Sequence, residues 1–190
     1  MSQENQIKFT DKILSSVFFW LPHSVKPNYL TILRLILVPV VAVLLIKELF
    51  IYALITFWFA AFTDALDGAF ARTRNQITNF GKLADPFADK MLIVTSLFVL
   101  SQKFLNPVLL VFVVIMEVIL ISWAVFRKFY YNETVQAEAS GKMKMGFQVL
   151  ATTLLIFFPV LHWIWLKKIA VYFLWTAVIF AAISISRRAI

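Results

Sequence analysis

The sequence contains no cysteine among its 190 residues. Disulfide bonds and thiolate metal sites are therefore excluded, and a metal ion has to be held by oxygen, nitrogen or thioether ligands. Acidic residues are also few, with 10 Asp and Glu against 18 Lys and Arg, which gives a formal net charge of +8. In a chain so poor in acids, any place where they gather calls for a chemical explanation.

Charged residues of both signs make up only 15% of the chain, whereas hydrophobic residues make up 62%. This balance is too apolar for a water-soluble domain and is typical of a small polytopic membrane protein. The N-terminus MSQENQIKFTDK lacks the basic region and the long apolar core of a signal peptide, so we expect it to be retained. The sequence predicts an N-terminal segment at residues 1–28 and one membrane domain at residues 29–190.

Six apolar segments approach the length of about 20 residues that a helix needs to cross a bilayer. They run from 29 to 46, 49 to 71, 83 to 100, 107 to 126, 145 to 161 and 169 to 185. Ahead of them, Ile13, Val17 and Trp20 share one face of a helix that is too short to cross and is expected to lie in the membrane interface. The predicted fold is an all-α integral membrane protein with six transmembrane helices after a short amphipathic interfacial helix.

The basic residues predict how these helices are oriented. With the N-terminus inside, 14 of the 18 Lys and Arg residues lie on the cytoplasmic side, which is all of them except Lys47, Lys103, Lys167 and Lys168. Both termini are therefore predicted to be cytoplasmic, in an inner-membrane protein. The cations are scattered along the membrane boundaries, so topology and attraction to anionic membrane lipids explain most of the net charge, and nucleic-acid binding has no support.

Four aspartates interrupt the apolar pattern near the cytoplasmic ends of the second and third predicted helices. Asp64 and Asp67 are three residues apart, and Asp85 and Asp89 are four apart, so each pair lies on one helix face. Converging ionised acids repel each other by about 4 kcal/mol per pair at about 4 Å and an effective dielectric of about 20. The cluster therefore takes up protons, as in a transporter, or divalent cations such as Mg²⁺, which prefers carboxylates with waters or substrate phosphates.

The residues beside the acids favour a metal-bound diphosphate over a proton relay. Gly68 and Gly81 each lie one helical turn from an aspartate, where a bare backbone lets a substrate approach closely. Arg72 is a fixed cation that suits bidentate binding of phosphate. A proton relay needs neither the glycines nor the arginine.

These residues form a pattern that resembles the full signature of the CDP-alcohol phosphotransferase family. The pattern reads Asp64-x-x-Asp67-Gly68-x-x-Ala71-Arg72, then eight residues, then Gly81-x-x-x-Asp85-x-x-x-Asp89. The stretches PNYLTILRLILVPV and LADPFADK are similar to the first and third helices of the family's phosphatidylglycerophosphate synthases. The resemblance implies a six-helix enzyme, usually a homodimer with a cytoplasm-facing site, that transfers a phosphatidyl group from CDP-diacylglycerol to an alcohol and releases CMP.

The resemblance also implies a role for each residue of the signature. Asp64, Asp67 and Asp85, together with Asp89, would hold one or two Mg²⁺ or Mn²⁺ ions, with two expected. Asp89 would in addition accept the proton of the attacking hydroxyl group. The residues implied to bind the CDP group are Asp64, Asp67, Gly68, Ala71, Arg72 and Gly81.

An acceptor that carries its own phosphate requires a second basic site. Lys142 and Lys144, at the start of the fifth predicted helix, and Arg34 in the first occupy positions expected from relatives that use glycerol-3-phosphate. Glu117 lies in the middle of the fourth helix and needs a partner, for which Arg34 and Lys142 are the candidates. The simpler alternatives are lysines that contact only lipid headgroups and a Glu117 that is merely buried and protonated.

One departure from the family pattern concerns the acceptor. Met116 stands where phosphatidylglycerophosphate synthases usually carry an arginine before the glutamate. Glycerol-3-phosphate is the predicted acceptor, and phosphatidylglycerol, as in the family's cardiolipin synthases, is the alternative. A function of another class is a cation carrier or channel built on the acidic cluster. The outer halves of the helices lack acids apart from Glu48 and Glu117, which argues against a continuous path for cations across the membrane.

Overall fold

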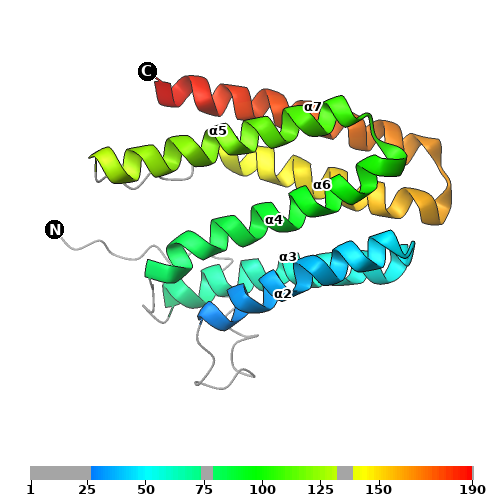
Figure 1. The fold of residues 1–190 in the computed structure, drawn as a ribbon, viewed down its shortest axis with the longest axis horizontal. Helices are drawn as coiled ribbons and strands as arrows, with labels where there is room; N and C mark the ends of the chain where they lie inside the picture. The colour runs from blue at the N-terminus through cyan, green and yellow to red at the C-terminus, as the bar shows by residue number, and fades with distance from the viewer. Residues whose placement is uncertain (1–26, 74–78, 132–138, 190) are drawn as a thin grey trace. The chain divides into compact units, whose positions relative to one another are not determined.

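The computed structural model describes residues 27–73, 79–131 and 139–189, and within them the side chains of residues 64–73 and 79–86 are among those not described. The described residues form six helices and no strand (Figure 1). The helices are α2 (Pro27–Ile46), α3 (Phe50–Thr73), α4 (Asn79–Phe104), α5 (Pro107–Tyr131), α6 (Ala139–Leu161) and α7 (Ile164–Ala189). The all-helical prediction is confirmed for this part of the chain, while the predicted interfacial helix lies outside it.

Each helix covers one of the predicted apolar segments to within one residue, and most extend beyond it. The largest difference lies at the start of α6, which begins at Ala139 and not at 145, and the two acid-bearing helices also extend further, with α3 continuing to Thr73 and α4 beginning at Asn79. Hydropathy ends a segment at its first charged residues, but the hydrogen bonds of an α-helix continue through arginine, lysine and alanine, which are good helix formers. The aspartates consequently lie further from the helix ends than the sequence predicted.

Two of the helices are long and apolar enough to cross a membrane, and they are Ser140–Leu161 within α6 and Ile164–Ser186 within α7. Shorter apolar stretches lie in α2, α3 and α5, at Thr31–Ile46, Phe50–Thr63 and Pro107–Trp123. A helix of 20 residues is about 30 Å long, which matches the hydrocarbon core of a bilayer. The membrane character therefore has its firmest support in α6 and α7, and six spans remain a prediction.

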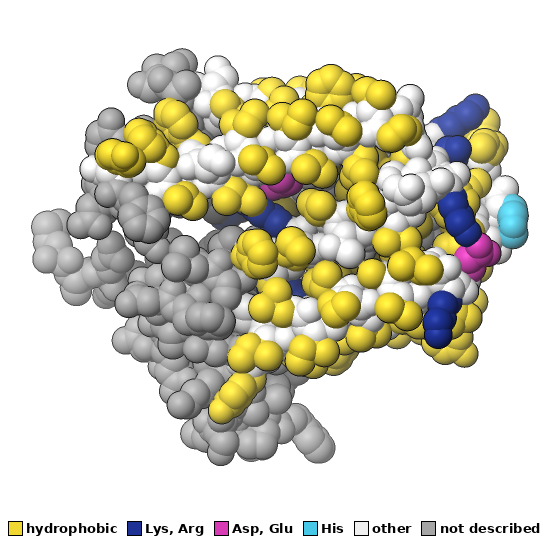
Figure 2. Space-filling view, viewed as in Figure 1, with side chains coloured by type: hydrophobic (Ala, Val, Ile, Leu, Met, Phe, Trp, Pro, Cys, Tyr) yellow, Lys and Arg dark blue, Asp and Glu magenta, His cyan; other side chains and the backbone are white. Residues whose placement is uncertain are grey.

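Large hydrophobic side chains are exposed along the helices and cover much of the face drawn in Figure 2. In α3, Tyr52, Ile55 and Phe59 are each more than half exposed, and α5 exposes Val111, Ile115 and others in the same way. Water-soluble monomers rarely expose apolar surface of this extent. A surface of this kind is expected of a protein that lies in a membrane.

The chain divides into two compact units. Unit 1 combines Met1–Val43 with Ile55–Leu92, and unit 2 combines Leu44–Leu54 with Ile93–Ile190. The boundaries fall within α2, α3 and α4, so each of these three helices belongs partly to unit 1 and partly to unit 2. In unit 1 the buried core includes Val38, Val41, Phe57, Ala60 and Ala88, whose small members let the helix backbones approach closely.

In unit 2, α6 and α7 form an antiparallel hairpin and pack along each other, with α5 against α7 (Figure 1). The hairpin turns at His162, which has a positive φ of 56°. Phe147 of α6 contacts the rings of Phe173 and Phe180 of α7, with ring centroids 5.6 Å apart in both cases. This packing places the first turns of α6, which contain Lys144, beside the last turns of α7.

The turns between helices carry charged and aromatic side chains at one end of unit 2, where Figure 2 shows lysine, acidic and histidine side chains together. Glu48 and Lys103 form an exposed ion pair there. Lys168 lies over the ring of Trp165, with Nζ 4.8 Å from the ring centroid. These lysines are among those predicted to face away from the cytoplasm, and a mixture of lysine and tryptophan suits a membrane interface.

Candidate active site

The four aspartates of the signature lie on α3 and α4, in unit 1. Asp64 and Asp67 are in the last three turns of α3, and Asp85 and Asp89 are in the first three turns of α4. Because both segments are helical, each pair occupies a single helix face, as the spacing predicts. The side chains of Asp64, Asp67 and Asp85 lie outside the described residues, as do the surroundings of the predicted CDP-binding residues Gly68, Ala71, Arg72 and Gly81.

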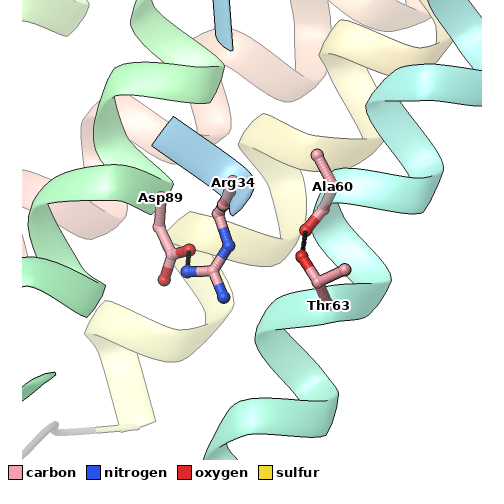
Figure 3. A network of polar contacts seen from close by, with 4 residues as sticks. All are labelled: Arg34, Ala60, Thr63 and Asp89. Atoms are coloured by element: carbon pink, nitrogen blue, oxygen red, sulfur yellow. Dashed lines mark hydrogen bonds and ion pairs between the residues drawn. The ribbon is translucent and has the colours of Figure 1, made fainter. Parts of the chain in front are cut away.

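Asp89 is the signature aspartate whose side chain the structure describes. Its Oδ1 accepts a hydrogen bond from Nη1 of Arg34 on α2, and the two side chains form an ion pair (Figure 3). The side chain of Arg34 is 0% exposed, whereas that of Asp89 remains 13% exposed. A buried guanidinium group needs a negative partner to offset its desolvation. Asp89 therefore stabilises Arg34 inside unit 1, and Arg34 in return fixes the carboxylate without enclosing it.

The helix turn that precedes the acids on α3 is uncharged, and its buried polar side chain forms a hydrogen bond within the same helix. Oγ1 of Thr63 donates to the backbone oxygen of Ala60 at 2.7 Å, within α3 (Figure 3). Both residues are buried. This bond satisfies a buried hydroxyl group without a partner from another helix, as threonine commonly does inside helices. Asp64 follows directly in the sequence, so the signature begins where this neutral turn ends.

A second buried cluster of polar groups lies in unit 2, between α5 and α6. Nζ of Lys144 donates to Oε1 of Glu117 at 2.5 Å, and Nε2 of Gln148 donates to the same oxygen at 2.9 Å. Each of the three residues is only 4% exposed. Lys144 and Gln148 are four residues apart, so they lie on the face of α6 that meets Glu117. The prediction that Glu117 needs a partner is confirmed.

The identity of that partner differs from the prediction. Lys142 is one of the two predicted partners, but its side chain is exposed, and Lys144 makes the ion pair instead. Residues two apart in a helix are separated by about 200° around the axis, so both lysines cannot face α5. The prediction is wrong for Lys142. Gln148 was missed because a single glutamine in an apolar helix forms no motif; its spacing of four from Lys144 is the signal that could have revealed it.

The kinds of side chain that could act as metal ligands indicate which metal ions this protein could hold. Among the side chains that the structure describes, no three His, Asp or Glu residues come together. Three of the four signature aspartates are outside that set. Carboxylate oxygens are the hard ligands that Mg²⁺ and Mn²⁺ prefer, and four of them on two sequential helices fit such ions.

Comparison with known proteins identifies the class. Residues 24–183 match the family model described as CDP-alcohol phosphatidyltransferase, a match that includes Arg34, all four aspartates, Glu117 and Lys144. The chain therefore belongs to the CDP-alcohol phosphatidyltransferase family, and it is an enzyme that transfers phosphatidyl groups. The resemblance read from the signature is confirmed. The family is membrane-associated, in agreement with the apolar α6 and α7.

The relatives narrow this class. A protein from Bacillus subtilis (strain 168) is 30% identical over 177 residues, which cover 83% of this chain and 90% of the relative. It is named CDP-diacylglycerol–glycerol-3-phosphate 3-phosphatidyltransferase. Proteins of the same name from Wigglesworthia glossinidia brevipalpis and Aquifex aeolicus (strain VF5) are 35% and 38% identical, over 66% and 54% of this chain and 72% and 61% of their own lengths.

Proposed function

We propose that this enzyme transfers the phosphatidyl group of CDP-diacylglycerol to glycerol-3-phosphate and releases CMP, as a step of phospholipid biosynthesis. The observation that carries the proposal is the similarity to the Bacillus protein of that name along 83% of this chain. Nearly the whole of both proteins is matched, so the similarity includes the helices that would bind the acceptor as well as the signature.

CDP-diacylglycerol would bind at the signature on α3 and α4. Its diphosphate would be held together with two Mg²⁺ or Mn²⁺ ions, for which the ligands are Asp64, Asp67, Asp85 and Asp89. Bound there, the ions act as Lewis acids on the phosphoryl group and offset the charge of the departing CMP. Arg72 would contact the phosphates, and the small residues Gly68, Ala71 and Gly81 would leave room for the nucleotide.

Asp89 would accept the proton of the acceptor hydroxyl group as its oxygen attacks phosphorus. The contact with Arg34 supports this role, because it fixes the carboxylate before the substrate arrives. Fixing a reacting group in advance lowers the entropic cost of the reaction. The incomplete burial of Asp89 leaves part of its side chain within reach of another molecule.

Glycerol-3-phosphate would bind through its phosphate to basic residues, for which the sequence offers Lys142 and Lys144, with the acid Glu117, in unit 2 and Arg34 in unit 1. Lys144 is the strongest candidate, because its buried ammonium group has three N–H donors and the contacts among described residues use one of them. Lys142 is exposed and would attract anions toward the site. Since Met116 replaces an arginine, Lys144 would carry a larger share of the phosphate charge.

The membrane arrangement follows from the same proposal. The excess of basic residues on one side of the predicted helices supports an inner-membrane protein with the active site and both termini in the cytoplasm. Family likeness supports a homodimer. Cross-linking in native membranes and protease accessibility of tagged termini would test these two points.

The acceptor is tested by offering the purified protein CDP-diacylglycerol with glycerol-3-phosphate, phosphatidylglycerol, inositol phosphate or serine in separate reactions. We expect CMP release and phosphatidylglycerophosphate, identified by mass spectrometry, with glycerol-3-phosphate alone. A chelator should stop the reaction, and added Mg²⁺ or Mn²⁺ should restore it. Cardiolipin formed from phosphatidylglycerol would overturn the acceptor but keep the family chemistry, whereas cation flux into liposomes without any cytidine nucleotide would favour a carrier.

A further inference from the structure

We infer that Gln148 is a positioning residue for the acceptor phosphate, because it holds Glu117 and Glu117 in turn holds the ammonium group of Lys144. The residue acts through these two side chains and does not touch the reacting atoms. The inference deepens the proposed function and rests on it for the identity of the acceptor, glycerol-3-phosphate.

The geometry centres on one oxygen atom. Oε1 of Glu117 accepts from both Nζ of Lys144 and Nε2 of Gln148, at 2.5 and 2.9 Å. The two donors come from successive turns of α6, and the acceptor comes from the middle of α5. Since all three side chains are buried, solvent cannot replace either donor. The direction of the Glu117 carboxylate is therefore set jointly by a charged and a neutral donor.

Gln148 belongs to a polar stripe on an otherwise apolar helix. Ser140, Lys144, Gln148 and Thr152 follow one another at intervals of four residues, and all four are buried. Polar residues on a membrane helix usually face other helices or a polar cavity, because lipid offers no hydrogen bonds. The stripe therefore marks the face of α6 that makes polar contacts. An apolar side chain of similar size could fill the space that Gln148 occupies, but only a polar side chain can donate a hydrogen bond to Glu117.

Glu117 provides the negative charge that a buried Lys144 requires. An ammonium group without a negative partner is costly to bury, so Glu117 offsets the charge of Lys144 inside unit 2 before substrate binds. Two of the three N–H donors of Lys144 have no partner among the described residues. Oxygen atoms of a phosphate monoester suit these donors, since charge-assisted hydrogen bonds are the strong ones.

Gln148 decides how tightly Glu117 retains the lysine. An incoming phosphate competes with Glu117 for the ammonium group of Lys144. The hydrogen bond from Gln148 satisfies Oε1 in the free enzyme and continues to satisfy it when Lys144 moves toward the phosphate. Without that donor, Oε1 of Glu117 loses one of the two hydrogen bonds described for it and holds Lys144 more firmly, so the acceptor binds less well.

The test is the replacement Gln148→Met, which keeps the length of the side chain and removes its donor. We expect the KM for glycerol-3-phosphate to rise about tenfold, as for the loss of a hydrogen bond to a charged group. Both kcat and the KM for CDP-diacylglycerol should stay within about twofold of the wild type. Thr153→Val is the matched control, because Thr153 bonds only to the backbone oxygen of Val149 on the same helix and should change neither KM.

A double-mutant cycle separates positioning from simple packing. If Gln148 acts through Glu117, Gln148→Met should have little further effect on the KM for glycerol-3-phosphate in a Glu117→Gln background. Additive effects of the two replacements would overturn the inference, since contacting residues that act together are not additive. Gln148→Asn keeps the carboxamide group but is too short to reach Glu117, so it should also raise the KM for glycerol-3-phosphate. This variant replaces Gln148→Met in the test if the methionine variant does not fold.

The inference and the proposed function can fail separately. An active wild type with an unchanged KM in both Gln148 variants, or a proportional loss of every kinetic constant, would overturn the inference alone. Stabilisation against thermal unfolding by glycerol-3-phosphate provides a second measurement. A wild type that is stabilised but inactive would overturn the proposed function, and a weaker stabilisation of Gln148→Met would still support the positioning role. A wild type that is neither active nor stabilised would overturn both.

Discussion

The two acids Asp89 and Glu117 are held by their cations in different ways. In unit 1, Arg34 binds Asp89 and leaves 13% of that side chain exposed. In unit 2, Lys144 and Gln148 both bind one oxygen of Glu117, whose side chain is 6% exposed. An acid that takes part in a reaction has to meet another molecule, whereas an acid that orients a neighbour does not. The difference supports the proposed role of Asp89 as the base and the supporting role inferred for Glu117.

The cations differ in a way that fits these roles. The guanidinium group of Arg34 is planar and rigid, so it fixes the direction of a carboxylate. The ammonium group of Lys144 is a compact charge on a flexible chain, and it can exchange one oxygen partner for another. These properties suit the roles proposed here, a fixed base in Asp89 and a movable phosphate ligand in Lys144.

The largest expected effect comes from removing the carboxylate in unit 1. Asp89→Asn should lower CMP release by about 10²- to 10⁴-fold, which is the usual contribution of a general base. The double replacement Arg34→Gln with Asp89→Asn should recover stability but not activity, because it removes the buried guanidinium group together with the carboxylate that it binds and leaves the base missing. Activity above a tenth of the wild type in Asp89→Asn would remove the distinction between the two acids.

The next effect concerns stability and compares the two ion pairs directly. Arg34→Gln should lower the free energy of unfolding by about 3–5 kcal/mol, because it removes the buried cation that pairs with Asp89. Lys144→Met should cost less, since Gln148 still donates to Glu117. Unfolding in mixed micelles, followed by circular dichroism, measures both, and Arg34→Lys is the charge-preserving control. Equal losses at the two sites would show that Gln148 contributes nothing.

The third effect separates the two lysines at the start of α6. Lys144→Met should raise the KM for glycerol-3-phosphate about 10- to 100-fold, the range expected for a lost charge-assisted hydrogen bond. Lys142→Met should change it by about threefold at most, since its exposed side chain contributes only a screened charge. Initial rates with varied acceptor at two salt concentrations provide the comparison. The reverse ranking would restore Lys142 as the acceptor ligand.

The smallest effect is expected at the exposed ion pair of unit 2. Glu48→Gln and Lys103→Gln should each change the free energy of unfolding by less than about 1 kcal/mol, because both side chains are about half exposed, at 57% and 52%. Activity should remain at the wild-type level. A loss as large as that of Arg34→Gln would mean that burial does not govern the strength of ion pairs in this protein.

Much of the fold and the whole of the family signature could be predicted from the sequence. The apolar segments coincide with the observed helices because both depend on residues that are close in the chain. Helix ends were less accurate at Asn79, Tyr131, Ala139 and Ile164, where charged residues continue the helix although they end the apolar run. The signature was readable for the same reason as the helices, since its spacing is local to α3 and α4.

The sequence by itself determined the helical class, the positions of the helices, the acidic signature and the family. Only the tertiary structure decided which cation meets which acid. Arg34 and Asp89 are 55 residues apart, and Lys144 and Glu117 are 27 apart, so their pairing depends on how each helix is rotated against its neighbours. That rotation is set by the packing of many side chains at once. No local pattern records it, which is why Lys144 and Gln148, and not Lys142, were found beside Glu117 only in three dimensions.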